Sequence, residues 1–327
     1  MKAILYTRYG PPEVLHVGQV ERPPPGEHEV LIRVRAAEAT KSDCEMRSFE
    51  FQVKWFWLPL RFAFGLFKPK RQVLGGYFSG VVASVGTGVS RFSAGDEVFG
   101  AARLKLGAYA EYLCLPDDYT LVPKPANLSF EEAAAVPLGG LNALHFLRRG
   151  NIQKGETVLV NGAGGSIGTF GVQIAKALGA EVTAVDSERK EDLLRRLGAD
   201  HFIDYAKEDF TRGGQAYDVI FSTVAKTPYT ACIKALRPGG RYLMANPKLS
   251  DMLRAALPHR RAGKTAVFAF ARELPEELLA LKEMLEDGRI RPVVDGIFPM
   301  ERAPEAHHRV ESEQRLGPVV ISMGNAD

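Results

Sequence analysis

The chain has 327 residues, 46% of them hydrophobic and 25% charged, and carries a formal net charge of +3 at pH 7. This length favours two domains, the apolar fraction is sufficient for two cores, and the small net charge gives no reason to expect a nucleic-acid partner. The three scattered cysteines, Cys44, Cys114 and Cys232, predict a reducing compartment without a disulfide framework, and no signal peptide is recognisable, so we expect a cytoplasmic protein.

The part of the chain before Leu121 is typical of a mainly antiparallel β domain. Short runs rich in β-branched and aromatic residues alternate with proline and glycine turns at 23–26 and 93–96. The expected strands span residues 3–6, 29–36, 79–85, 97–99 and 109–115.

Residues 49–67 form an aromatic segment that contains both tryptophans and is followed by a basic stretch at 68–71. A transmembrane helix is excluded, because Lys54, Pro59 and Arg61 interrupt a run that is barely long enough to span a bilayer. The segment is explained as ordinary core or a dimer surface, or as a contact with a membrane surface. We do not expect the last of these, a contact with a membrane surface.

A buried strand, a glycine cluster and a helix follow one another after residue 157. The strand is rich in valine and leucine, and apolar residues at three- and four-residue spacing then predict a helix over 169–178, ended by Gly179. The informative glycines of the cluster are Gly162, Gly165 and Gly168. The first permits a tight turn, the second lets the backbone approach a pyrophosphate, and the third lets the helix pack against the strand.

A second strand, Glu181–Asp186, ends on an acid, and together these features predict a dinucleotide-binding loop rather than an ordinary turn of a parallel sheet. A carboxylate at Asp186 would accept from the ribose 2′-hydroxyl of NAD and repel the 2′-phosphate of NADP. Ser187, Arg189 and Lys190 follow at once and suit that phosphate. Arg189 and Lys190 are equally explained as the solvated first turn of a helix, so both cofactors stay open at this point.

Strands and helices continue to alternate up to residue 288. Strands are expected at 201–205, 217–223, 240–246 and 264–270, and helices at 188–197, 228–236 and 275–287. This alternation predicts a parallel sheet covered by helices on both faces.

Five segments of the chain resemble the medium-chain dehydrogenase/reductase superfamily, and specifically its zinc-independent quinone oxidoreductase branch, which includes zeta-crystallin. They are residues 75–82, 95–100, 107–112, 134–143 and the glycine loop at 158–168. The resemblance implies an α/β fold in which a GroES-like, mainly antiparallel β domain is joined to a Rossmann domain with a doubly wound parallel sheet. The GroES-like domain would span residues 1–122, completed by 266–327, and the Rossmann domain residues 123–265. A homodimer is also expected.

Zinc-dependent members of the superfamily have a Cys where this chain has Thr40, and a His–Glu pair where it has Gly76 and Tyr77. A catalytic zinc needs three protein ligands, and none of these three residues is a good one. The four-cysteine lobe of those members is also missing, since Phe99 is followed almost directly by Gly107. We therefore expect no metal site and no zinc.

The activity that the resemblance implies is a transfer of hydride from NAD(P)H to a small hydrophobic acceptor. Without a metal to hold charge on a carbonyl oxygen, reduction of a quinone or an α,β-unsaturated carbonyl (an enone or enal) is easier to explain than alcohol oxidation. The resemblance places Thr40, Lys41, Asp43 and Tyr77 at the cleft. We expect Thr40 and Tyr77 to be catalytic, as donors that face the substrate. The alternative is that Asp43 caps a helix turn and Tyr77 packs in the β core.

In quinone oxidoreductase relatives a lysine and a tyrosine surround the adenosine 2′-phosphate, and Lys190 and Tyr205 match them. We therefore favour NADP(H), with NAD(H) as the alternative. The cofactor-binding residues that the loop and the resemblance imply are Asn142, Gly162, Gly165, Ser166, Ile167, Gly168, Asp186, Ser187, Lys190, Tyr205, Thr223 and Asn246.

Two other functions stay open. The crystallin relatives suggest a cofactor-binding structural or regulatory protein, and the superfamily also contains alcohol dehydrogenases and enoyl reductases. The resemblance adds a third interpretation of residues 49–67, as a hydrophobic lid over the acceptor pocket.

Overall fold

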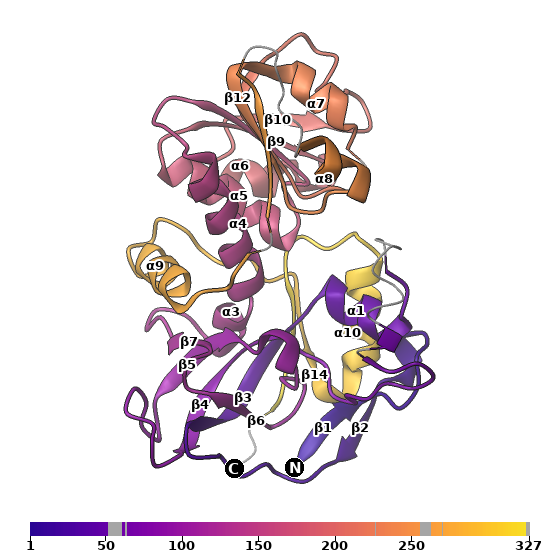
Figure 1. The fold of residues 1–327 in the computed structure, drawn as a ribbon, viewed down its shortest axis with the longest axis vertical. Coiled ribbons are helices and arrows are strands. Elements are labelled where there is room, and N and C mark those ends of the chain that lie inside the picture. The colour runs from indigo at the N-terminus through magenta and orange to yellow at the C-terminus, as the bar shows by residue number, and fades with distance from the viewer. Residues whose placement is uncertain (52–60, 63, 226, 256–262, 270, 325–327) are drawn as a thin grey trace. The chain divides into compact units, whose positions relative to one another are not determined.

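The computed structural model describes residues 1–51, 61–62, 64–225, 227–255, 263–269 and 271–324. These residues form two compact units, which differ in architecture (Figure 1). The terminal unit comprises Met1–Leu138, Glu273–Glu286 and Pro292–Asp327, and the central unit comprises Gly139–Arg272 and Asp287–Arg291. Both ends of the chain therefore contribute to the same unit.

The terminal unit is built on a seven-stranded sheet in the order β14-β15-β3-β4-β5-β7, with β6 paired to β3. Its strands are β3 (Glu29–Ala39), β4 (Tyr77–Val85), β5 (Glu97–Ala101), β6 (Tyr112–Pro116), β7 (Thr120–Pro123), β14 (Gly296–Pro299) and β15 (Val319–Ser322). All neighbours are antiparallel except β14 and β15. A separate antiparallel pair is formed by β1 (Lys2–Leu5) and β2 (His16–Gln19). The prediction of a mainly antiparallel β region is confirmed.

Helices α1 (Lys41–Ser48), α3 (Phe130–Ala134), α9 (Pro275–Glu286) and α10 (Ala303–Glu311) belong to the terminal unit. Among them, the sequence predicted α9 outright and a helix turn at Asp43, where α1 begins, as an alternative. In α10 the buried residues are Ala303, Ala306, His307 and Val310, a spacing that places one face of the helix inward. This face packs against β14, β15 and α1.

The central unit contains a six-stranded parallel sheet in the order β10-β9-β8-β11-β12-β13. Its strands are β8 (Thr157–Asn161), β9 (Glu181–Asp186), β10 (His201–Asp204), β11 (Tyr217–Ser222), β12 (Leu236–Met244) and β13 (Thr265–Phe268). Helices α5 (Ser166–Ala177) and α6 (Glu191–Arg196) lie on one side of this sheet, and α7 (Tyr229–Ala235) and α8 (Leu249–Ala255) on the other (Figure 1). The predicted parallel sheet with helices on both faces is confirmed. The strand order reverses at β8, which is where open parallel sheets bind their ligands.

Two elements of the central unit differ from the prediction. The single helix expected over 188–197 is divided into a 3₁₀ turn and α6. Strand β12 starts earlier than expected, at Leu236, and β11 pairs with it there and again from Arg241. Residues 237–240 form an irregular insertion, because Pro238 has no N–H group with which to join the ladder.

Most of the aromatic segment at 49–67 lies outside the described residues, namely 52–60 and 63, so its three interpretations stay predictions. Of its described residues, Phe62 and Phe67 are 62% and 87% exposed. No helix among the described residues is both long enough and apolar enough to cross a membrane.

Candidate functional site

The glycine loop connects β8 to α5, and its first glycine adopts a backbone conformation that other residues avoid. Gly162 has a φ of +81°, and a Cβ atom there would lie 2.4 Å from the Oγ1 atom of Thr223. That hydroxyl donates to the carbonyl oxygens of Asn161 at 3.1 Å and Gly162 at 3.3 Å. The loop is therefore fastened to the end of the neighbouring strand β11.

The other two glycines of the loop differ in how closely the protein surrounds them. A Cβ atom at Gly168 would lie 2.1 Å from the carbonyl oxygen of Gly162, so α5 can pack this closely only with glycine. A Cβ atom at Gly165 would meet only that same oxygen, at an ordinary 3.7 Å. The protein itself thus does not require glycine at Gly165, and the space beside it fits the pyrophosphate of a dinucleotide. Gly165 is also the N-cap of α5 without a side-chain cap, a helix start of the kind that binds phosphate, and buried Ser166 and half-buried Ile167 form its first turn.

Asp186 ends β9, and three donors of the protein engage its carboxylate. It accepts hydrogen bonds from the N–H groups of Gly164 and Ser187, both at 2.8 Å, and forms an ion pair with Lys190 at 3.2 Å. Lys190 is buried, and its ammonium also lies 3.4 Å from the carbonyl oxygen of Gly164. The two charges therefore neutralise each other within the loop, whereas Arg189 is exposed.

The remaining predicted cofactor residues come from neighbouring elements of the central unit. Tyr205 follows β10, donates its N–H to the carbonyl oxygen of Asp186 at 3.2 Å, and has a side chain that is 64% exposed. Asn246 follows β12, and its side-chain amide donates to the carbonyl oxygen of Thr223 at 2.9 Å. Asn142 is half-buried on α4 (Pro137–Gly150). The structure thus gathers the loop, Asp186, Tyr205, Thr223 and Asn246 along the carboxyl edge of the sheet.

A polar cluster at the same edge was not predicted. The side-chain amide of Asn161 donates to the hydroxyl oxygens of Ser222 at 3.2 Å and Thr227 at 2.8 Å. The available signal was that both β8 and β11 end on a polar residue after an apolar run.

In the terminal unit, Thr40 and Asp43 form a buried capping box at the start of α1. The Thr40 hydroxyl donates to Asp43 Oδ2 at 2.6 Å, and Asp43 Oδ1 accepts from the Gly75 N–H at 3.0 Å. Burial raises the pKa of Asp43, although the hydrogen bonds from Thr40 and Gly75 act in the opposite direction. Thr40 is only 2% exposed, and its hydroxyl hydrogen is engaged by this cap. The structure shows the helix cap at Asp43 that was given as an alternative.

Tyr77, at the start of β4, donates its hydroxyl hydrogen to Glu273 Oε1 at 2.6 Å. Glu273 precedes α9 and was not predicted, since 196 residues separate the two partners along the chain. Burial, followed by the charge of Glu273, raises the pKa of Tyr77 well above its ordinary value. Burial also raises the pKa of Glu273, against the effects of the Tyr77 hydrogen bond and of Arg103. Tyr77, one of the two predicted substrate donors, is thus hydrogen-bonded to a carboxyl group.

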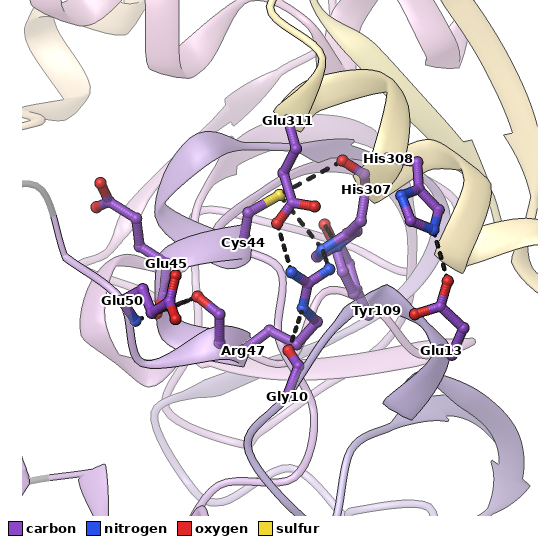
Figure 2. A network of polar contacts seen from close by, with 11 residues as sticks. Gly10, Glu13, Cys44, Glu45, Arg47, Glu50, Tyr109, His307, His308 and Glu311 are labelled. Atoms are coloured by element: carbon purple, nitrogen blue, oxygen red, sulfur yellow. Dashed lines mark hydrogen bonds and ion pairs between the residues drawn. The ribbon is translucent and has the colours of Figure 1, made fainter.

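Figure 2 shows a second buried network, which joins α1 to α10. The ring of His307 places Nε2 3.2 Å from the Tyr109 hydroxyl and Nδ1 3.4 Å from Cys44 Sγ. Arg47 approaches the same Nδ1 at 3.4 Å and forms an ion pair with Glu311. Burial, and next the charge of Arg47, lowers the pKa of His307 to about 3, and burial raises the pKa of Cys44. The ring is neutral and the sulfur is a thiol, so the network joins two helices and supplies no thiolate nucleophile.

Metal-binding side chains are scattered in both units. Within the ranges that the structure describes, no three His, Cys, Asp or Glu side chains gather as a metal ion requires. The three cysteines, Cys44, Cys114 and Cys232, are buried and unbridged.

Comparisons with known proteins give matches to both parts of the chain. The family model for an alcohol dehydrogenase GroES-like domain matches residues 26–126, and the one for a zinc-binding dehydrogenase matches residues 197–321. The chain is 32% identical to 2-methylene-furan-3-one reductase of Solanum lycopersicum, over 98% of this chain and 79% of that protein. It is also 32% identical to the chloroplastic NADPH-dependent alkenal/one oxidoreductase of Arabidopsis thaliana, with the same coverage. The solved quinone oxidoreductase of Coxiella burnetii matches with a TM-score of 0.87 and 28% identity over 99% of both chains.

Proposed function

The chain belongs to the medium-chain dehydrogenase/reductase superfamily, in its quinone oxidoreductase branch, and we propose that it is an NAD(P)H-dependent reductase of quinones or α,β-unsaturated carbonyls. The observation that carries this proposal is the glycine loop, in which Gly165 leaves space that a pyrophosphate would fill. A bound nicotinamide would supply a hydride, and so two electrons, to the acceptor. A conjugated acceptor spreads the developing charge over its own π system, so hydrogen-bond donors are sufficient to stabilise it.

Among the two nicotinamide cofactors we favour NADP(H), because Lys190 already neutralises Asp186. An unpaired carboxylate would repel a 2′-phosphate, but this one accepts two backbone hydrogen bonds and pairs with a buried ammonium at 3.2 Å. These internal donors also compete with a ribose 2′-hydroxyl for the same oxygens. Half-buried Ser187 adds a hydroxyl group beside the pair, 3.5 Å from Asp186 Oδ1, and the backbone N–H of exposed Tyr205 contacts the Asp186 carbonyl oxygen. NAD(H) remains the second cofactor, with measurable use.

In the terminal unit we assign Thr40 and Tyr77 as the donors to the substrate, with Tyr77 the stronger candidate. Thr40 is buried and donates within its capping box, whereas Tyr77 is half-buried and paired with an acid. The proposed reaction uses no zinc, because hydroxyl groups stand at these two positions and Gly76 offers no side chain. The homodimer and the cytoplasmic location expected from the sequence stay predictions.

The purified protein tests the proposal when it is mixed with NADPH or NADH and either 1,2-naphthoquinone or an enal. We expect oxidation of NADPH matched by reduction of the acceptor, and the same rate after treatment with a chelator. Binding of NADPH without turnover over a broad acceptor panel would favour the cofactor-binding structural protein instead. Elemental analysis that finds about one zinc per chain, with activity lost to the chelator, would contradict the zinc-independent reaction.

A further inference from the structure

Tyr77 and Glu273 form a tyrosine–carboxyl pair whose distance is short for a hydrogen bond between two oxygens, at 2.6 Å. Both residues are half-buried, so the pair is neither sealed in the core nor freely solvated. A group that hands protons to a substrate and regains them from water needs this intermediate position.

Hydrogen bonds hold the backbone of Glu273 in place. Glu273 has a φ of +49° and its neighbour Arg103 a φ of +48°, both in the region that non-glycine residues avoid. The Glu273 carbonyl oxygen accepts hydrogen bonds from the Thr120 hydroxyl and from the Arg103 guanidinium, the latter at 2.9 Å. Thr120 is fully buried. Strained residues that persist because their surroundings determine them are found preferentially at functional sites.

Charged side chains from three other parts of the unit alter the pKa values of Tyr77 and Glu273. Glu38 on β3 and Asp43 on α1 both add to the burial that raises the pKa of Tyr77, after the larger effect of Glu273 itself. Arg103 is the cation that lowers the pKa of Glu273, and it does not outweigh the effect of burial. Glu273 therefore keeps its proton to a higher pH than an exposed glutamate does.

We propose that Tyr77 delivers the proton that completes the reduction and that Glu273 restores it, an inference that rests on the function proposed above. Once the acceptor has gained a hydride, it carries a negative charge on oxygen. The O–H bond of Tyr77 then breaks, its electron pair stays on the Tyr77 oxygen, and a new O–H bond forms on the acceptor. For this step Glu273 is protonated and the hydrogen bond of the pair runs from its carboxyl O–H to the Tyr77 oxygen across the same 2.6 Å contact, which leaves the Tyr77 hydrogen free for the acceptor. The Glu273 carboxyl passes its proton to the Tyr77 oxygen and is itself reprotonated by water. No further oxidant or reductant is needed, because both electrons arrive with the hydride.

The competing explanation is a structural one, in which the pair only ties the segment before α9 to β4. Such a tie would affect folding and stability, but it would not make the rate depend on the protonation of Glu273. The two explanations therefore differ in their pH profiles.

The test uses Tyr77→Phe, Glu273→Gln and the double variant, with NADPH and either an enal or 1,2-naphthoquinone. Tyr119→Phe and Glu29→Gln are matched controls, since Tyr119 keeps its ring beside Arg103 and Glu29 forms its ion pair with Lys105 elsewhere in the unit. The kcat for each acceptor, the KM for NADPH and the melting temperature are measured across the pH range in which the protein stays folded.

Each single variant should lower the kcat for the enal by about 10²-fold or more, with little change in the KM for NADPH, and the double variant should lose no more than either alone. The loss should be smaller for the quinone, whose reduced form is a weaker base. The wild-type kcat should fall as pH rises through the pKa of Glu273, because the proton on its carboxyl is then lost. Glu273→Gln should abolish this dependence, and neither control should alter it.

Variants that keep the wild-type kcat, or a pH dependence that survives in Glu273→Gln, would overturn this inference and leave the proposed function intact. If the wild-type protein oxidises NADPH with neither the enal nor the quinone, both this inference and the proposed function would be overturned. If both variants unfold where the controls do not, the wild-type kcat is measured against pH and in H₂O and D₂O. A kcat that is independent of pH and equal in the two solvents would exclude proton delivery by the pair.

Discussion

The ammonium group of Lys190 lies 3.2 Å from Asp186 and is buried with it beside the backbone of Gly164. A 2′-phosphate would give this ammonium a second anionic partner, and a charge-assisted hydrogen bond contributes about 1.5–3 kcal/mol. We therefore expect Lys190→Ala to raise the Michaelis constant for NADPH by about 10- to 100-fold, at roughly 1.4 kcal/mol per tenfold, and to spare NADH.

Asp186→Gly should act in the opposite direction and strengthen NADPH, because it frees the ammonium from its internal partner. Lys176→Ala is the control, since that lysine pairs with Asp200 at the far end of α5. If Lys190→Ala leaves the constant for NADPH unchanged while Asp186→Gly costs mainly NADH, the protein is an NAD enzyme.

His307 makes the stability of the terminal unit depend on pH. In the unfolded chain its imidazole titrates near the ordinary pKa of 6.5, whereas burial lowers the pKa to about 3 in the folded protein. Between these values the unfolded chain binds one more proton, so the folded state loses stability as pH falls, by at most about 1.4 kcal/mol per pH unit. Above pH 6.5 the contribution of His307 is fully present.

Chemical denaturation at a series of pH values checks this. His307→Gln should flatten the dependence of the free energy of unfolding on pH in that window. His308→Gln is the control on the same helix, because His308 is exposed and pairs with Glu13 at 2.6 Å (Figure 2). Equal slopes in wild type and His307→Gln would show that this ring does not control acid stability.

At the scale of the element, two glycines at the start of α5 have different roles. We expect Gly168 to be required by the fold and Gly165 by a bound cofactor. A Cβ atom at Gly168 would lie 2.1 Å from backbone, whereas at Gly165 its nearest contact would be 3.7 Å. Gly168→Ala should therefore lower the melting temperature, because the helix has to move away from the loop. Gly165→Ala should leave the melting temperature unchanged and weaken NADPH binding. An unaltered dissociation constant for NADPH in Gly165→Ala would place the pyrophosphate elsewhere.

The elements that the sequence predicted well are those with a local signal. Strand β8, the glycines and β9 follow one another within thirty positions or so, and each reports on its own backbone. The acid Glu273 and the ring of His307 carry no such signal, because their partners Tyr77 and Cys44 lie 196 and 263 residues away. The capping box of α1 was readable as an alternative, but its buried contact with the distant Gly75 N–H, at 3.0 Å, was not.

At the scale of the whole molecule, the return of the chain to its first domain was expected from the resemblance alone. The local sequence of Val319–Ser322 does not show that this strand pairs with β3, where Val319 lies opposite Ala39 and Ser322 opposite Ala36. Pairings between distant segments depend on the complete fold, and this is why the alternation pattern described the central unit better than the terminal one.

The same interleaving affects the protein during its synthesis. The residues of β3 leave the ribosome before those of β15, and their pairing edge at Ala36–Ala39 must wait for β15, because Val319 follows Ala39 by 280 positions. Until then the nascent terminal sheet exposes an unpaired strand edge, which is a site for wrong pairing and aggregation. The central unit consists almost entirely of residues 139–272 and completes its sheet earlier. A chaperone that engages the nascent chain should therefore be held longest by the N-terminal β segment.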